Sequence, residues 1–254
     1  MKKYIFAALL LTDVVFASTL HVSYSANVGR LNPLLATDSA SSEISDWLFD
    51  SLLKYDKEGR ISPQMAKSYR FVDDKTLVME LRDNLKWWDG KPVTAKDAVF
   101  TYEFTKNPKV FTPYVENYRK VESVTAKDDK TIIVKYKEPY FKALEVWLSP
   151  LLPSHILSAE KEPMTSKFNF NPIGNGAYKL SKLEQGKEIE LVANPGYFEG
   201  EAKIKKVSYQ FLPDPSTQFL MLKTGKLDMG GLTPMQLAKQ IDSSFRQKYQ
   251  IIQN

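Results

Sequence analysis

The sequence contains no cysteine among its 254 residues. This excludes disulfides, thiolate metal sites and cysteine nucleophiles, and it leaves no cysteine that could carry a lipid anchor. A chain of this length can bury a core that is stable without disulfides, so an oxidising compartment remains compatible with the composition. We therefore expect a free protein, and a periplasmic one is consistent with this composition.

Residues that do chemistry are also scarce. The only histidines, His21 and His155, have no second histidine or carboxylate at ligand spacing, which favours structural roles for both. No serine lies in a nucleophile elbow, and no lysine follows a glycine-rich phosphate loop. The glycines of "GNGAY" (174–178) lack the dinucleotide-binding spacing, so they indicate a requirement of the backbone. We expect no enzyme activity, no cofactor and no metal site.

A concentrated basic face is absent as well. The formal net charge is +5, but lysines alternate with acidic residues along most of the chain. The densest group, Lys203, Lys205 and Lys206, alternates with apolar residues as a strand would. Nucleic-acid binding usually requires a basic patch, so we expect no nucleic-acid partner.

The N-terminus has the pattern of a secretory signal. Lys2 and Lys3 precede an apolar run, and small Ala17 provides a cleavage point. The run is too short to span a bilayer, and polar sequence follows it directly. We interpret residues 1–17 as a cleaved signal peptide that directs the protein to the periplasm. Asp13 lies inside the apolar run and should weaken its insertion.

Periodicity predicts a mixed α+β fold. Residues 20–26 alternate like a strand, and a helix is expected from Ser39 to Leu52, capped by Asp38 or Ser39. Hairpins are expected around residues 128–129 and 185–186. A strand over 203–213 precedes a helix capped by Asp214, and a last helix is expected to start at Pro234. There is no succession of βαβ units.

Two adjacent tryptophans, Trp87 and Trp88, could form a ligand-stacking surface or a structural corner. The preceding residues alternate as a strand that should end before the Asp89-Gly90 turn. Thr94 then caps a helix, with Asp97 able to return the hydrogen bond. Neighbouring side chains of an extended segment point to opposite faces, so we favour the structural interpretation.

The order of several motifs resembles the family 5 extracellular solute-binding proteins, which bind oligopeptides, dipeptides or nickel for bacterial ABC importers. The resemblance runs from about Leu20 to Met229. The motifs are "LNP", "ISPQMAKSYRFVDDKTLVMELRDNLKWWDGKPVTAKDAVF", "KEPYFKAL", "LPSHIL", "NPIGNGAYKL", "ANPGYFEG" and "LKTGKLDM".

This resemblance implies an α+β, periplasmic-binding-protein-like fold of type II, in the extended peptide-binder class. The first lobe would consist of a core subdomain, residues 18–33 and 148–235, and an inserted subdomain, residues 34–147. Residues 236–254 would begin the hinge and a second lobe that is otherwise missing from this sequence. We expect the chain alone to bind peptide at least tenfold more weakly than an intact relative, about 1.4 kcal/mol or more.

The resemblance also implies non-catalytic capture of a peptide by a monomer, which delivers it to an inner-membrane ABC permease complex. The segment after the "LNP" turn would run along the peptide, and an aromatic residue would cover it. The residues in these places are Thr37, Asp38, Ser39, Ala40 and Tyr114. A nickel chelate is the alternative ligand, although Ala36 and Ser41 stand where nickel binders have an aromatic residue and methionine. A secreted hydrolase with an unrecognised site is an alternative of another class.

Overall fold

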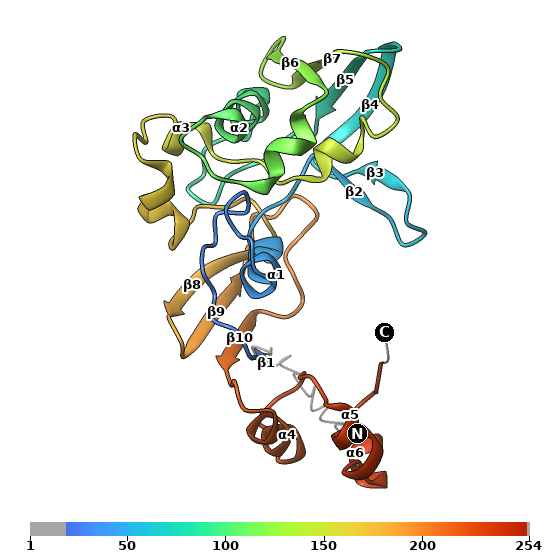
Figure 1. Ribbon diagram of the computed structural model, residues 1–254, viewed down its shortest axis with the longest axis vertical. Helices are drawn as coiled ribbons and strands as arrows, with labels where there is room; N and C mark the ends of the chain where they lie inside the picture. Colours follow the sequence, from blue (N-terminus) through green and yellow to red (C-terminus); the bar gives the residue numbers. More distant parts are fainter. Residues whose placement is uncertain (1–18, 253–254) are drawn as a thin grey trace, which may run out of the picture.

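The computed structural model describes residues 19–252, so the predicted signal peptide lies outside the described residues. Two four-stranded sheets lie one above the other in Figure 1, and a group of short helices lies below them. Strands and helices are mixed without successive βαβ units, which confirms the α+β expectation.

The first sheet has the strand order β1-β10-β9-β8, with β1 parallel to β10 and the other pairs antiparallel. Its strands are β1 (Thr19–Tyr24), β8 (Tyr178–Glu184), β9 (Glu188–Ala193) and β10 (Lys206–Phe211). Helix α1 (Ser39–Leu48) packs against this sheet, since Trp47 meets the ring of Tyr178 edge-on at 5.1 Å. The β8–β9 hairpin turns at Gly186, as the sequence predicts.

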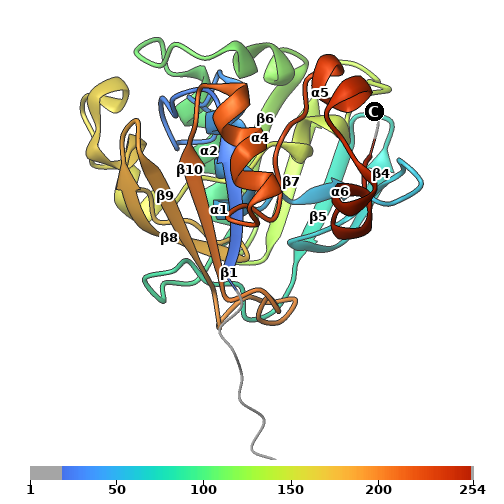
Figure 2. The same ribbon diagram turned by 90° about the horizontal axis from the view of Figure 1, so that it is seen from below.

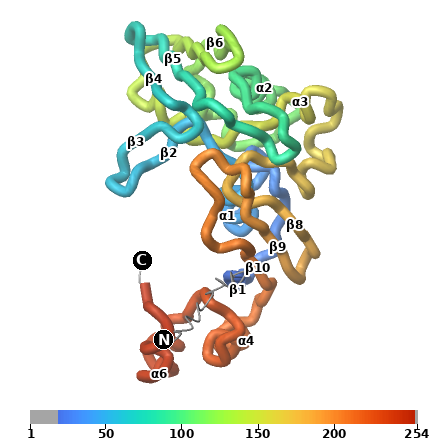
Figure 3. The backbone as a smooth tube through the Cα atoms, turned by 180° about the vertical axis from the view of Figure 1, so that it is seen from behind, coloured from blue at the N-terminus to red at the C-terminus, as the bar shows by residue number. Residues whose placement is uncertain are grey.

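The second sheet is antiparallel, in the order β4-β5-β7-β6. Helix α2 (Ala95–Lys106) packs on it and starts with the Thr94–Asp97 capping box expected from the sequence. A small two-stranded sheet, β2–β3, projects beside it (Figure 3). These strands are β2 (Leu53–Tyr55), β3 (Ile61–Pro63), β4 (Ala66–Asp73), β5 (Thr76–Leu81), β6 (Val121–Ala126) and β7 (Thr131–Tyr136).

Short helices connect and extend the sheets. The connecting ones are η1 (Pro113–Tyr118), η2 (Glu145–Leu148), α3 (Ser154–Leu157), η3 (Pro163–Thr165) and η4 (Lys167–Asn169). The final ones are α4 (Pro215–Lys223), α5 (Pro234–Lys239) and α6 (Ser243–Lys248), which Figure 2 shows from below. One continuous apolar core spans both sheets, and α4 and α6 share a separate small core around Phe219 and Phe245.

The tryptophan pair is structural, as predicted. Trp87 is fully buried, and its indole nitrogen donates to Asp97 Oδ2 at 3.3 Å. The Trp88 indole donates instead to the carbonyl oxygen of Gly176 at 3.4 Å, which ties the second sheet to the segment that leads into β8. The two side chains therefore stabilise different contacts, and neither forms an open stacking platform.

The glycines of residues 174–178 allow a close backbone approach. The amide of Gly176 donates to the carbonyl oxygen of Leu48 at 2.9 Å. A Cβ atom on Gly174 would overlap that same carbonyl oxygen. These glycines therefore permit the end of α1 to lie directly against the segment before β8, which confirms their backbone role.

Two expectations about the helices are wrong. Helix α1 ends at Leu48, because the amides of Asn175 and Gly176 donate to the Leu48 carbonyl that a longer helix would use, so Leu52 lies beyond it. Strand β5 ends at Leu81, before the Asp89-Gly90 turn as expected, and the chain turns at Asn84 with φ +62°. The helix that starts at Pro234 is not the last one, since α6 follows it.

Candidate functional site

The candidate site is built around a buried loop, residues 31–36, between β1 and α1. The Leu31 amide donates to the Asn169 carbonyl at 2.6 Å, and the Asn32 side chain donates to Asn169 Oδ1 at 3.1 Å. The Asn32 Oδ1 atom accepts from the Leu34 amide at 3.2 Å. These bonds satisfy the polar groups of an irregular segment that would otherwise be costly to bury, and they fix its path.

The four residues after this loop differ in accessibility. Asp38 is the N-cap of α1, and its carboxylate accepts from the Ser41 amide at 2.8 Å and from the Ser41 hydroxyl at 2.6 Å. Ala40 is buried, whereas Thr37 and Ser39 are exposed. Thr37 and Ser39 can therefore reach a ligand with their side chains, while the Asp38 carboxylate is already bonded within the helix end.

Tyr114 lies in η1, the short helix before β6 of the second sheet, and it contacts the same loop. The Thr112 hydroxyl donates to the Leu34 carbonyl at 2.6 Å, and the Tyr114 hydroxyl donates to the Ala36 carbonyl at 3.5 Å. Pro113 begins the helix η1, with Thr112 as its cap. The structure thus brings Tyr114 beside the loop that precedes Thr37, and these residues are separated by more than seventy positions in the sequence.

A cavity of about 190 Å³ lies between α1, η1 and the end of η2. Its wall is apolar on the loop side, and the segment at the end of η2 adds two apolar residues and one serine, while α1 contributes two hydroxyl groups and one carboxylate. The lining residues are Pro33, Leu34, Ser42, Ser45, Asp46, Tyr114, Leu148, Ser149 and Pro150. Tyr114 is the predicted site residue among them.

The exposed side of α1 is acidic. Burial raises the pKa of the Asp46 carboxyl, and the neighbouring Glu43 charge raises it further. Glu43 accepts from the Tyr209 hydroxyl at 3.3 Å, and that hydroxyl also accepts from the Trp47 indole at 2.9 Å. Burial raises the pKa of Tyr209, so its hydroxyl stays protonated and holds Glu43 against the sheet.

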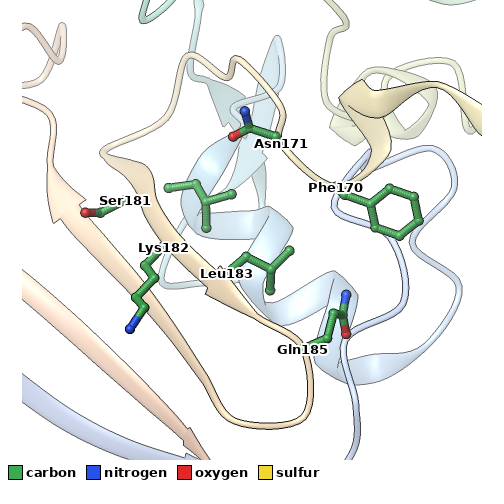
Figure 4. A pocket seen from close by; sticks show the side chains of 7 residues that line it. Phe170, Asn171, Ser181, Lys182, Leu183 and Gln185 are labelled. Atoms are coloured by element: carbon green, nitrogen blue, oxygen red, sulfur yellow. The ribbon is translucent and has the colours of Figure 1, made fainter.

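Two other hollows are separate from this cavity. One, of about 510 Å³, is a shallow groove along the edge strand β8, lined by side chains of β8 and of residues 170–171 (Figure 4). The other, of about 830 Å³, lies among α4, α6 and residues 228–232. None of the five predicted site residues lines either hollow.

Among residues 19–252, no group of three or more histidine, cysteine, aspartate or glutamate residues is arranged to hold a metal ion. His155 does have a carboxylate partner across space, since its Nε2 lies 2.7 Å from Asp89 Oδ2. No helix in this described part of the chain is long and apolar enough to cross a membrane.

Sequence reasoning did not find Asp46 or the wall formed by Leu148, Ser149 and Pro150. The sequence does contain a pattern that could have indicated Asp46: residues 31–50 contain four carboxylates and no lysine or arginine, although the chain is basic overall. The wall formed by residues 148–150 depends on the path of the chain after η2, which no local sequence pattern indicates.

The sequence of this chain is similar to those of known solute-binding proteins. Residues 60–253 match the family described as bacterial extracellular solute-binding proteins, family 5. The periplasmic oligopeptide-binding protein OppA of Haemophilus influenzae is 32% identical over 222 residues, which cover 78% of this chain and 41% of that protein.

Solved structures of solute-binding proteins also match this chain. The structure of NikZ from Campylobacter jejuni in complex with Ni(L-His) matches with a TM-score of 0.81 and 29% identity, over 89% of this chain and 45% of that one. The oligopeptide-binding protein AppA of Bacillus subtilis, in complex with a nonapeptide, matches with a TM-score of 0.81 and 27% identity, over 87% of this chain and 45% of that one. The chain therefore spans less than half the length of these relatives, and its fold corresponds to that part of them.

Proposed function

Because the chain belongs to the bacterial extracellular solute-binding proteins of family 5, a family of non-catalytic transport components, we propose that it binds peptides for an ABC importer. The proposed binding surface consists of Thr37, Asp38, Ser39, Ala40 and Tyr114 around the cavity beside α1. The observation that carries the proposal is the meeting of Tyr114 with the 31–36 loop at this cavity.

The chemistry of this surface suits an extended peptide. Main-chain hydrogen bonds give affinity without reading side-chain identity, and the exposed Thr37 and Ser39 offer hydroxyl and backbone groups for them. The half-buried ring of Tyr114 provides a rigid aromatic wall at little entropic cost. Relatives support the same ligand class, since OppA and AppA are both named for oligopeptides.

The remaining parts of the proposal concern organisation. We propose a core subdomain of residues 18–33 and 148–235, an inserted subdomain of residues 34–147, and a hinge that begins after residue 235. The protein would act as a periplasmic monomer after loss of residues 1–17 and would deliver its ligand to an inner-membrane permease. A closing lobe would bury the ligand that this surface holds on one side.

Titration calorimetry of the chain with a mixture of short peptides tests the proposal. Tyr114→Ala should weaken binding about tenfold or more, because it removes the aromatic wall of the cavity. Tyr55→Ala is the matched control, since Tyr55 is an exposed tyrosine on the β2–β3 hairpin. It should bind like the unmodified chain.

The nickel–histidine complex bound by NikZ is the competing ligand in the same titration. If the chain binds this chelate and no peptide, the peptide assignment is wrong while the family assignment stands. Equal affinity of the Tyr114→Ala and Tyr55→Ala variants for peptide would show that the site lies elsewhere.

A further inference from the structure

The cavity beside α1 is too small for a whole peptide. Its volume of about 190 Å³ is below the roughly 300–1,000 Å³ that pockets for complete small-molecule ligands occupy. On the proposed peptide-binding function, it therefore receives one side chain or one terminal group of the ligand. The chemistry of its lining then decides which group fits.

Three of the four hydroxyl groups that line the cavity donate their protons within the protein, and Ser149 is the fourth. Ser42 donates its proton to the Ala36 carbonyl at 3.2 Å, and Ser45 donates to the Leu31 carbonyl at 3.2 Å. Tyr114 likewise donates to the Ala36 carbonyl at 3.5 Å. Each of these oxygens retains lone pairs but has no proton left for a ligand. These three oxygens therefore favour a ligand group that donates hydrogen bonds, while the Ser149 hydroxyl can donate or accept.

The charge of the lining residues also favours a ligand group that donates hydrogen bonds, in particular a cationic one. Asp46 is the one ionisable carboxylate in the wall, and no lysine or arginine lines the cavity. Within residues 19–252, no lysine, arginine or histidine nitrogen forms an ion pair with Asp46. Partial burial and the Glu43 charge raise the pKa of Asp46, and a cation bound beside this carboxylate would offset both effects by stabilising its ionised form.

The apolar walls fit the rest of a long cationic side chain. Pro33, Leu34, Leu148 and Pro150 line the cavity beside the hydroxyl groups. Lysine and arginine bury their methylene stems along such surfaces while the charged head reaches a polar partner. We propose that this cavity is a subsite for an alkylammonium or guanidinium group of the peptide ligand, with Asp46 as the residue that determines this specificity.

Calorimetric titration of the full chain with three alanine pentapeptide amides tests this proposal. One is N-acetylated with a central lysine, one is N-acetylated with a central norleucine, and one has a free amino terminus with a central norleucine. The lysine peptide carries its cation only on the side chain, the last peptide carries it only at the terminus, and the second carries none. At least one cationic peptide should bind about fivefold to tenfold more tightly than the neutral one.

Asp46→Asn should reduce this preference to about twofold or less while affinity for the neutral peptide is retained. Glu43→Gln is the matched control, because it removes a neighbouring charge on α1 that does not line the cavity, and it should retain the preference. Circular dichroism of both variants verifies that they fold. The peptide whose advantage Asp46→Asn removes identifies the source of the cation, side chain or terminus.

Equal affinity of the unmodified chain for all three peptides would overturn the subsite while leaving the peptide-binding function intact. The subsite is also overturned if Asp46→Asn keeps the preference, or if Glu43→Gln loses it to the same degree, since the effect would then be long-range. If none of the peptides binds, the subsite fails together with the proposed function.

Discussion

Replacement of Asp50 by asparagine should stabilise the protein at neutral pH. Asp50 is 7% exposed, and its Oδ1 accepts from Gln64 Nε2 at 2.6 Å, while its Oδ2 has no hydrogen-bond partner. Burial raises the pKa of this carboxyl from 3.8 to about 6; the neighbouring Tyr197 hydroxyl opposes this rise, and the nearby Glu199 charge adds to it. The folded state therefore disfavours the ionised form of Asp50.

The sign of the pH dependence follows from proton binding. Between pH 4 and 6 the unfolded chain loses the Asp50 proton while the folded chain keeps it, so the free energy of unfolding decreases as the pH rises. The raised pKa corresponds to at most about 3 kcal/mol, at about 1.36 kcal/mol per pH unit, and the cost is fully present above pH 6. Asparagine keeps an acceptor for Gln64 but places an amide nitrogen where Oδ2 has no partner. We therefore expect a net gain of about 1–2 kcal/mol at pH 7.5.

Urea denaturation followed by tryptophan fluorescence, at several values between pH 4 and pH 8, measures the difference between the two proteins. The advantage of Asp50→Asn should grow from nearly zero at pH 4 to its full value above pH 6. Asp128→Asn is the control, because a hydrogen bond from the Lys130 backbone amide lowers the pKa of that exposed carboxyl, so the stability difference for this variant should change little between pH 4 and pH 8. A constant difference across this range, or a destabilised Asp50→Asn variant at pH 7.5, would refute the reasoning.

Two further predictions concern glycines. Gly174→Ala should destabilise the fold by more than about 2 kcal/mol, because its Cβ would overlap the Leu48 carbonyl. Gly196→Ala is the control and should cost far less, since its Cβ meets nothing closer than 3.6 Å. Urea denaturation compares the two variants, and equal stability would contradict the close approach of the backbone at Gly174. Gly90→Val should lower the free energy of unfolding by about 1–2 kcal/mol because of the φ of +87° alone, since nothing lies within 4 Å of the new Cβ. Gly231→Val is the control: its Cβ also meets nothing within 4 Å, but Gly231 has no positive φ, so this variant should unfold at nearly the original urea concentration.

Local rules predicted local structure well. The Thr94–Asp97 capping box, the Asp214 cap with Pro215 at the first helical position, and the β6–β7 and β8–β9 hairpins each depend on residues a few positions apart. Such contacts cost little loop entropy, so the sequence nearby is enough to specify them. The wrong predictions occur where a distant segment makes the contact, as where Asn175 and Gly176 bond to the Leu48 carbonyl at the end of α1.

The candidate site depends on distant contacts of this kind. Tyr114 meets the Ala36 carbonyl across 78 positions, and β1 pairs with β10 across most of the chain. The resemblance to a known family brought Thr37, Asp38, Ser39, Ala40 and Tyr114 forward as site residues, and their role in binding stays a prediction. The cavity and its carboxylate required the three-dimensional arrangement, because the wall after η2 comes from residues 148–150.

The most direct test of the central claim is to map where a peptide touches the chain. A short peptide that carries a benzoylphenylalanine can be cross-linked by light to the folded protein, and the attachment positions can be read by mass spectrometry after proteolysis. The account predicts attachment within residues 33–46 and at the segment that contains Tyr114, reduced by excess unlabelled peptide. Attachment to the β8 groove around Phe170 and Leu183, or labelling that excess peptide does not compete away, would contradict it.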